Sequence, residues 1–139
     1  MRFELATDIK ITTTISRELL EGIFATALEG GSSYWAYITD EQWDIVDEES
    51  KYAKYLNGGE EKMLFTILDI KVDIEINCAE NNDKVLGILS AKTIKKRLQS
   101  LSHHDNYSRF LYAELNGEGD AESSDVIFQY LVLGEVIYG

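Results

Sequence analysis

Two short stretches carry the most distinctive mixture of polar, aromatic and glycine residues in this chain. EGGSSYW spans residues 29–35, and GDAESSDVIFQYLVLGEVIYG spans residues 119–139. Asp125 and Gln129 are four residues apart, so they share one face of a helix. If the glycine corner of the first stretch lies near them, its backbone amides together with Tyr34 and Trp35 would complete a polar and aromatic pocket. Such a pocket suits a planar or sugar-bearing ligand, or a hot spot for a protein partner.

The same residues also admit a purely structural role. Gly30 and Gly31 would end a helix, one of them in the left-handed conformation. Trp35 would fill the core, and Asp120 would cap the last helix. Tyr138 would hold the last residues against the sheet. The sequence leaves both interpretations open.

A second candidate site is the basic cluster KTIKKRL, in which three lysines lie on nearly one helical face: Lys92, Lys95 and Lys96. Lys92 and Lys96 are neighbours at i, i+4 and repel each other unless an anion or an acid lies between them. One interpretation is salt bridging to the chain's own acids. The other is a site for a phosphorylated ligand or an acidic partner surface.

The motifs of the common nucleotide-binding and hydrolytic sites do not occur. The sequence has no GxGxxG, no GxxxxGK[ST] and no GxSxG. His103 and His104 are adjacent, so on a helix they point about 100° apart and cannot chelate one ion together. Cys78 is the only cysteine, which excludes an intrachain disulfide and a multi-cysteine zinc site. We therefore expect no metal, no cofactor and no catalytic residue.

Carboxylates are abundant and unevenly distributed. Asp69, Asp73 and Glu75 alternate within a predicted strand, where they form a solvated face or bind a hard cation. Carboxylates at i, i+2 repeat every ~6.6 Å along a strand, a separation like that between neighbouring phosphates. Together with the acids of residues 40–61, such a face would mimic a nucleic acid.

Composition narrows the function classes. The chain has 139 residues, with 25 acidic against 13 basic side chains and a net charge of -12. This sign disfavours direct binding to nucleic acids and to anionic membranes. No apolar run approaches the roughly 20 residues of a membrane span, and residues 1–10 lack the features of a signal peptide. We expect a soluble cytoplasmic protein, and its eight tyrosines and two tryptophans favour a homo-oligomer.

The helices and strands that must position these residues are predicted from the spacing of apolar residues and from the positions of capping and turn residues. In the first half we predict a strand over residues 2–15, a helix capped by Ser16 and ended by Gly30 and Gly31, and a short strand over residues 32–38. Residues 39–61 read as an acidic loop, with turn chemistry at Asn57-Gly58-Gly59.

In the second half, alternation predicts a strand over residues 63–76, and a turn at residues 81–83 leads to a strand over residues 85–89. Helices follow from Ser90 to about Leu101, over residues 105–115, and from Asp120 to Gly134. The order predicts one α+β domain over residues 1–139, with a mostly antiparallel sheet packed by the N-terminal helix and three C-terminal helices.

The two distinctive stretches resemble a family of small phage and prophage proteins. Members begin with a strand and a helix ending in an EGGSNYW-like motif and close with a pattern like GD-aE--D---Q----GE--YG. The resemblance covers both ends of the chain, with Ser33 where the family has Asn. By position, the implied binding residues are Glu29, Gly30, Gly31, Ser33, Tyr34, Trp35, Asp120, Asp125, Gln129, Glu135 and Tyr138.

The resemblance implies a non-enzymatic phage accessory protein. Such a protein binds and neutralises a host component, either a host-defence protein or a small signalling molecule. The first alternative is an acidic nucleic-acid mimic that inhibits a DNA- or RNA-binding host protein. The second is a small hydrolase that uses carboxylates such as Asp120, Asp125 and Glu135, although no pair of nucleophile and base is visible.

Overall fold

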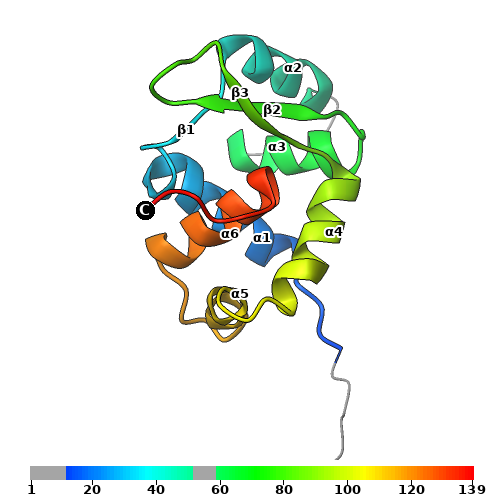
Figure 1. The fold of residues 1–139 in the computed structure, drawn as a ribbon. Helices are drawn as coiled ribbons and strands as arrows, with labels where there is room; N and C mark the ends of the chain where they lie inside the picture. The colour runs from blue at the N-terminus through cyan, green and yellow to red at the C-terminus, as the bar shows by residue number, and fades with distance from the viewer. Residues whose placement is uncertain (1–11, 52–58) are drawn as a thin grey trace, which may run out of the picture.

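The computed structural model describes residues 12–51 and 59–139, which form an α+β fold as predicted (Figure 1). In chain order the elements are α1 (Arg17–Thr26), the π-helical turn η1 (Ala27–Gly31), β1 (Ala36–Tyr37), α2 (Asp40–Ser50), α3 (Gly59–Leu68), β2 (Ile74–Cys78), β3 (Val85–Leu89), α4 (Ala91–Ser102), α5 (Ser108–Leu115) and α6 (Ala121–Leu133).

The sheet is small and antiparallel, in the order β1-β2-β3. Ala36 pairs with Cys78 at one edge, and Ile74 pairs with Leu89 at the other. Because β1 has only two residues, the rest of that edge of β2 needs another partner. The side chain of Gln42, on α2, supplies it by accepting a 2.9 Å hydrogen bond from the backbone N–H of Glu75. The first turn of α2 therefore continues the edge where β1 stops.

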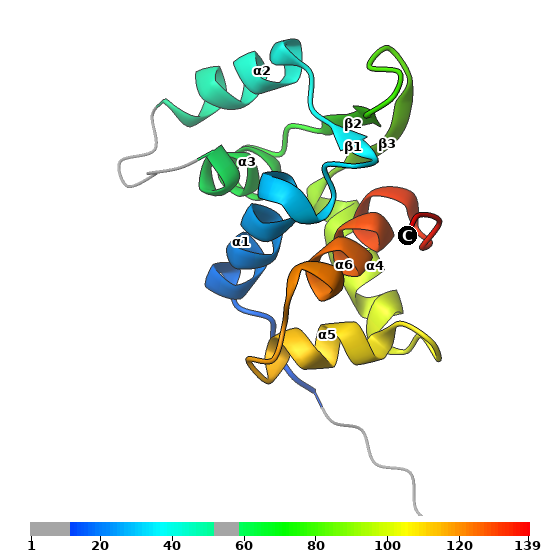
Figure 2. The ribbon, with the colours of Figure 1, turned by 90° about the vertical axis from the view of Figure 1, so that its left-hand side faces the viewer.

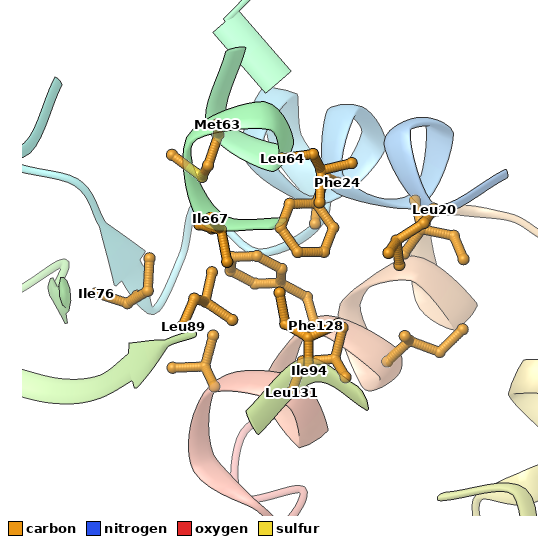
Figure 3. Close-up of a cluster of buried hydrophobic side chains, with 14 of the residues drawn as sticks. Leu20, Phe24, Met63, Leu64, Ile67, Ile76, Leu89, Ile94, Phe128 and Leu131 are labelled. Atoms are coloured by element: carbon orange, nitrogen blue, oxygen red, sulfur yellow. The ribbon is translucent and has the colours of Figure 1, made fainter. Parts of the chain in front are cut away.

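Helix α6 forms the centre of the molecule. Its residues 123–132 are all buried, as expected for a helix covered on every side. Helices α1, α4 and α5 and strand β3 contact it (Figures 1 and 2). Figure 3 shows Phe128 of α6 beneath Phe24 of α1, and the two rings meet edge to face at 5.3 Å. Side chains from α3, β2 and β3 close the same core.

Local capping chemistry fixes four helix ends at residues that the sequence predicts. The hydroxyls of Ser16 and Ser90 accept hydrogen bonds from the third backbone N–H after them, at 3.1 Å in both cases. Asp120 caps α6 in a reciprocal capping box with Ser123. Gly134 ends α6 with φ 78°, in the left-handed region.

The cationic side chain of Arg97, on α4, stabilises the same end of α6. Its Nη1 donates to the carbonyls of Leu131 and Val132 at 2.8 and 2.7 Å. These carbonyls lie in the last turn of the helix, where the dipole favours positive charge. Helices α4 and α6 are therefore joined by charge as well as by apolar contact.

Two predicted elements in the middle of the chain are wrong. Residues 40–50 and 59–61 belong to α2 and α3 where the sequence suggested an acidic loop, and residues 63–68 are helical where alternation suggested a strand. Met63, Leu64 and Ile67 are fully buried, which is helical spacing. The alternation around them misled because a short apolar run fits either period. The predicted turn at Asn57-Gly58 lies outside the described residues.

This correction separates carboxylates that were expected to share one strand face. Asp69 follows α3 and forms an ion pair with Arg17 at 2.8 Å. Asp73 precedes β2, and only Glu75 lies within the strand. The predicted carboxylate ladder is therefore absent from this part of the described chain.

Smaller corrections concern the ends of other elements. Residues 12–15 form no strand, and the rest of the predicted strand over residues 2–15 lies outside the described residues. Neither Gly30 nor Gly31 is left-handed, because the helix ends through the wider turn η1 instead. Only Ala36–Tyr37 of the predicted strand over residues 32–38 pairs, and α5 begins at Ser108, three residues later than expected.

The packing of β3 on α6 can be tested at a glycine. A Cβ added to Gly87 would collide with the carbonyl and a side-chain methyl of Val132. We expect Gly87→Ala to lower the free energy of unfolding by about 2 kcal/mol, because α6 must shift. Gly22→Ala is the matched control, since Gly22 is exposed on α1 and nothing lies within 4 Å of an added Cβ.

The control substitution should raise the free energy of unfolding by about 0.5 to 1 kcal/mol, since alanine favours a helix interior. Urea unfolding followed by circular dichroism measures both values. Equal effects at the two positions would contradict the close approach of β3 and α6.

Candidate functional site

The two distinctive stretches meet at one buried carboxylate. Asp125, on α6, is 9% exposed and accepts four side-chain hydrogen bonds. Ser32 Oγ and Trp35 Nε1 each donate to its Oδ1 at 2.8 Å. Tyr34 Oη and Gln129 Nε2 donate to its Oδ2 at 2.6 and 3.2 Å. We call these five residues the Asp125 cluster.

The end of α1 sets the position of three donors. Helix α1 continues into the π-helical turn η1, and the N–H of Ser32 closes this turn on the carbonyl of Ala27 at 2.8 Å. A Cβ on Gly31 would lie 3.0 Å from the carbonyl oxygen of Ala121, so glycine lets η1 approach the first turn of α6. The chain then turns so that Ser32, Tyr34 and Trp35 reach Asp125.

Gln129 extends the cluster to the last residues of the chain. Its side chain is fully buried, and its Oε1 accepts from the backbone N–H groups of Ile137 and Tyr138, both at 2.9 Å. Its Nε2 also donates to the carbonyl of Tyr138 at 3.1 Å. The ring of Tyr138 stacks on Trp35, with centroids 5.3 Å apart. The ring of Tyr138 thus packs on Trp35, just before β1, whereas the structural interpretation placed it against the sheet.

The electrostatics of the cluster are unusual because the buried carboxylate has no cationic partner among residues 12–51 and 59–139. Hydrogen bonds replace the water that Asp125 loses on burial. This environment raises the pKa of Tyr34 from 10.0 to about 12. Burial contributes most, followed by the hydrogen bond to Asp125 and the negative charge of Asp125, whereas the hydrogen bond with Gln129 lowers the pKa. The Tyr34 hydroxyl therefore remains a donor throughout the neutral range.

These contacts also determine what a ligand could touch. Trp35 and Gln129 are buried at 2% and 0% exposure, and their polar groups bind within the protein. Beside the cluster, an open hollow of about 630 Å³ is lined by Thr26, Glu29, Gly30, Gly31, Ala121, Glu122 and Asp125. Tyr34 and Ile137 remain about half exposed at 50% and 58%. The accessible part of the site is thus acidic with nearby apolar side chains.

The other residues carried over from the resemblance lie around this region without joining the cluster. Asp120 is occupied as the N-cap of α6. Ser33 is exposed and donates to the carbonyl of Gly30 at 3.0 Å. Glu135 is exposed just after α6. Sequence reasoning missed Ser32, although it lies within EGGSSYW and its burial is complete.

The basic cluster divides between two hollows. Lys92 and Lys95 line one hollow together with Lys71, whereas Lys96 lines only a second hollow, which it shares with Lys92, Tyr130 and Gly134. Lys71 was not foreseen, because nothing in its local sequence indicates that it faces α4.

Comparison with other proteins supplies no family for this chain. Neither protein families, nor curated proteins, nor solved structures gave a match. Within the described ranges, no helix is long and apolar enough to cross a membrane, and no group of three or more His, Cys, Asp and Glu could hold a metal ion.

The buried carboxylate makes a direct stability prediction. We expect Asp125→Asn to lower the free energy of unfolding by about 3 kcal/mol, because its amide group would face donors where the carboxylate accepted. The measurement is urea unfolding at neutral pH. Glu122→Gln, one turn earlier and exposed, should change the free energy by no more than about 0.5 kcal/mol. An Asp125→Asn variant as stable as this control would refute the role of the charge.

The raised pKa of Tyr34 predicts a specific pH dependence. The folded protein holds the phenolic proton more tightly than the unfolded chain, so this contribution is complete below pH 10.0 and is lost as pH rises towards about 12. The difference in unfolding free energy between wild type and Tyr34→Phe should therefore be larger at about pH 9 than at about pH 11. A difference that stays constant over this range would contradict the assignment.

Proposed function

We propose that this chain is a non-enzymatic binding protein of the phage accessory type, which neutralises a host-defence protein or a small signalling molecule of the host. One observation carries the proposal. The two stretches that supply the resemblance to phage and prophage proteins meet: three side chains of EGGSSYW bind Asp125 of the α6 stretch, 90 to 93 residues away.

The geometry favours binding over catalysis. Two of the three acids expected of a hydrolase are engaged in structural hydrogen bonds, since Asp120 caps α6 and Asp125 accepts from four donors. The cluster instead fixes a surface on which Tyr34 is held by its hydroxyl while part of its ring stays exposed. A pre-positioned tyrosine provides contact area at little entropic cost, which suits a protein hot spot.

The proposed binding surface comprises Tyr34, Ile137 and the rim of the adjacent hollow, to which Glu29 and Glu122 belong. We expect Glu29→Lys/Glu122→Lys to abolish retention of a host component when tagged protein is purified gently from bacterial lysate. Native mass spectrometry then reports any added small molecule or host protein.

The matched control is Glu80→Lys/Glu118→Lys, which makes the same charge change at exposed positions outside the hollow. It should retain the host component fully. If both double variants retain the host component equally, or both lose it equally, the proposed binding surface is not the binding site.

A second candidate function, the acidic nucleic-acid mimic, is favoured by helix α2. Figure 2 shows α2 at the outer end of the molecule, where it packs on α3. Its exposed acids include Asp40, Asp44 and Glu48 at i, i+4 spacing, which repeats every ~6 Å along a helix. Such a row lies within the range of phosphate spacings, although Lys51 pairs with Glu48 at 2.6 Å.

Neutralising this row separates the two candidates. For a mimic, Asp40→Asn/Asp44→Asn should weaken binding to a basic host protein about tenfold, and binding should fall steeply with added salt. If the partner instead binds the proposed binding surface beside Asp125, the same variant should retain it unchanged. The retained mass in the pull-down, compared at low and high salt, distinguishes these outcomes.

A further inference from the structure

Three lysines from two separate segments line one hollow on the side of the molecule away from η1. Lys71 lies between α3 and β2, and Lys92 and Lys95 lie in the first half of α4. The hollow has a volume of about 620 Å³, and its remaining lining residues are Asp73, Ser90 and Ala91. In Figure 1 the start of α4 is on the right, whereas η1 and the C-terminus are on the left.

The backbone explains why Lys71 joins the two lysines of α4. It has φ 67° and is the only non-glycine residue in the left-handed region among those described. At this point the chain leaves α3 and turns into β2, whose neighbour β3 runs directly into α4. The turn therefore brings a side chain 21 residues distant in sequence to the start of α4.

These lysines lack the acidic partners that a strongly acidic chain could provide. The sequence has 25 Asp and Glu residues, yet none of the three lysines forms an ion pair within the described parts of the chain. Asp73 shares the hollow without pairing with them. Internal salt bridging therefore does not explain their placement.

We propose that this hollow binds a phosphorylated small molecule, at a site separate from the surface beside Asp125. Like charges brought together repel, and an anion placed between them reverses the sign of that interaction. A group with several phosphate oxygens could accept from all three ammonium groups. The volume is in the range of small-molecule sites. A long polyanion fits less well, because a net charge of -12 would repel the part outside the hollow.

Inorganic pyrophosphate is a suitable probe, because it carries the proposed chemistry and nothing else. We would titrate it into the ¹⁵N-labelled chain at low ionic strength and follow backbone amide shifts. Saturable shifts should be confined to residues 71–73 and 90–96. Lys71→Gln and Lys95→Gln should each raise the Kd about three- to tenfold.

Two controls make the result decisive. Lys84→Gln removes an exposed lysine outside the hollow and should leave the Kd within about twofold. Asp73→Asn removes the only acid among the described residues that line the hollow and should lower the Kd, the opposite direction from the lysine variants. All four substitutions are at exposed positions, so matching spectra verify that the fold persists.

The proposal is overturned if millimolar pyrophosphate gives no saturable change in amide shifts. It is overturned too if backbone amides near every exposed lysine, including Lys84, shift to the same extent. It is also overturned if the Lys71 and Lys95 variants bind as wild type does. Loss of host-component retention in the Glu29/Glu122 variant has no bearing on this titration, so the two proposals fail independently.

Discussion

The structure depends on the requirement that a carboxylate buried inside it be hydrogen-bonded. Asp125 loses most of its hydration in the folded chain and has no described cation to compensate for it. Only donors from elsewhere in the chain can stabilise its charge, and three of the four come from the segment after η1. This requirement joins α1 to α6, and through Gln129 it also fixes residues 137 and 138.

The same constraint limits where function can reside. Side chains that satisfy Asp125 and Gln129 cannot also bind a ligand without exposing a buried polar group, which is costly. In the proposed binding function, the buried motif residues therefore position a surface. Its contacts would come from Glu29, Glu122 and the half-exposed ring of Tyr34, whose hydroxyl alone is bound within the cluster. The lysine hollow lies outside this network, so its side chains remain available.

How much the sequence could predict depends on the range of the interactions involved. Contacts within a few residues set the helix starts at Ser16, Ser90 and Asp120 and the helix end at Gly134, so local chemistry identified these positions. The period of residues 63–68 was ambiguous, and burial in the assembled core selected a helix. Asp125 and Gln129 were expected to share a face, but spacing could not show which donors, 90 to 93 residues away, bind Asp125.

Hydrogen exchange of the two tryptophan indoles tests the central role of Asp125 most directly. Trp35 Nε1 donates to the buried carboxylate, whereas Trp43 is only half-buried and no such bond forms at its indole in the described structure. The indole N–H of Trp35 should exchange only through global unfolding, and that of Trp43 through fast local opening. Exchange of Trp35 as fast as that of Trp43 would show that the cluster opens locally, which would contradict this account.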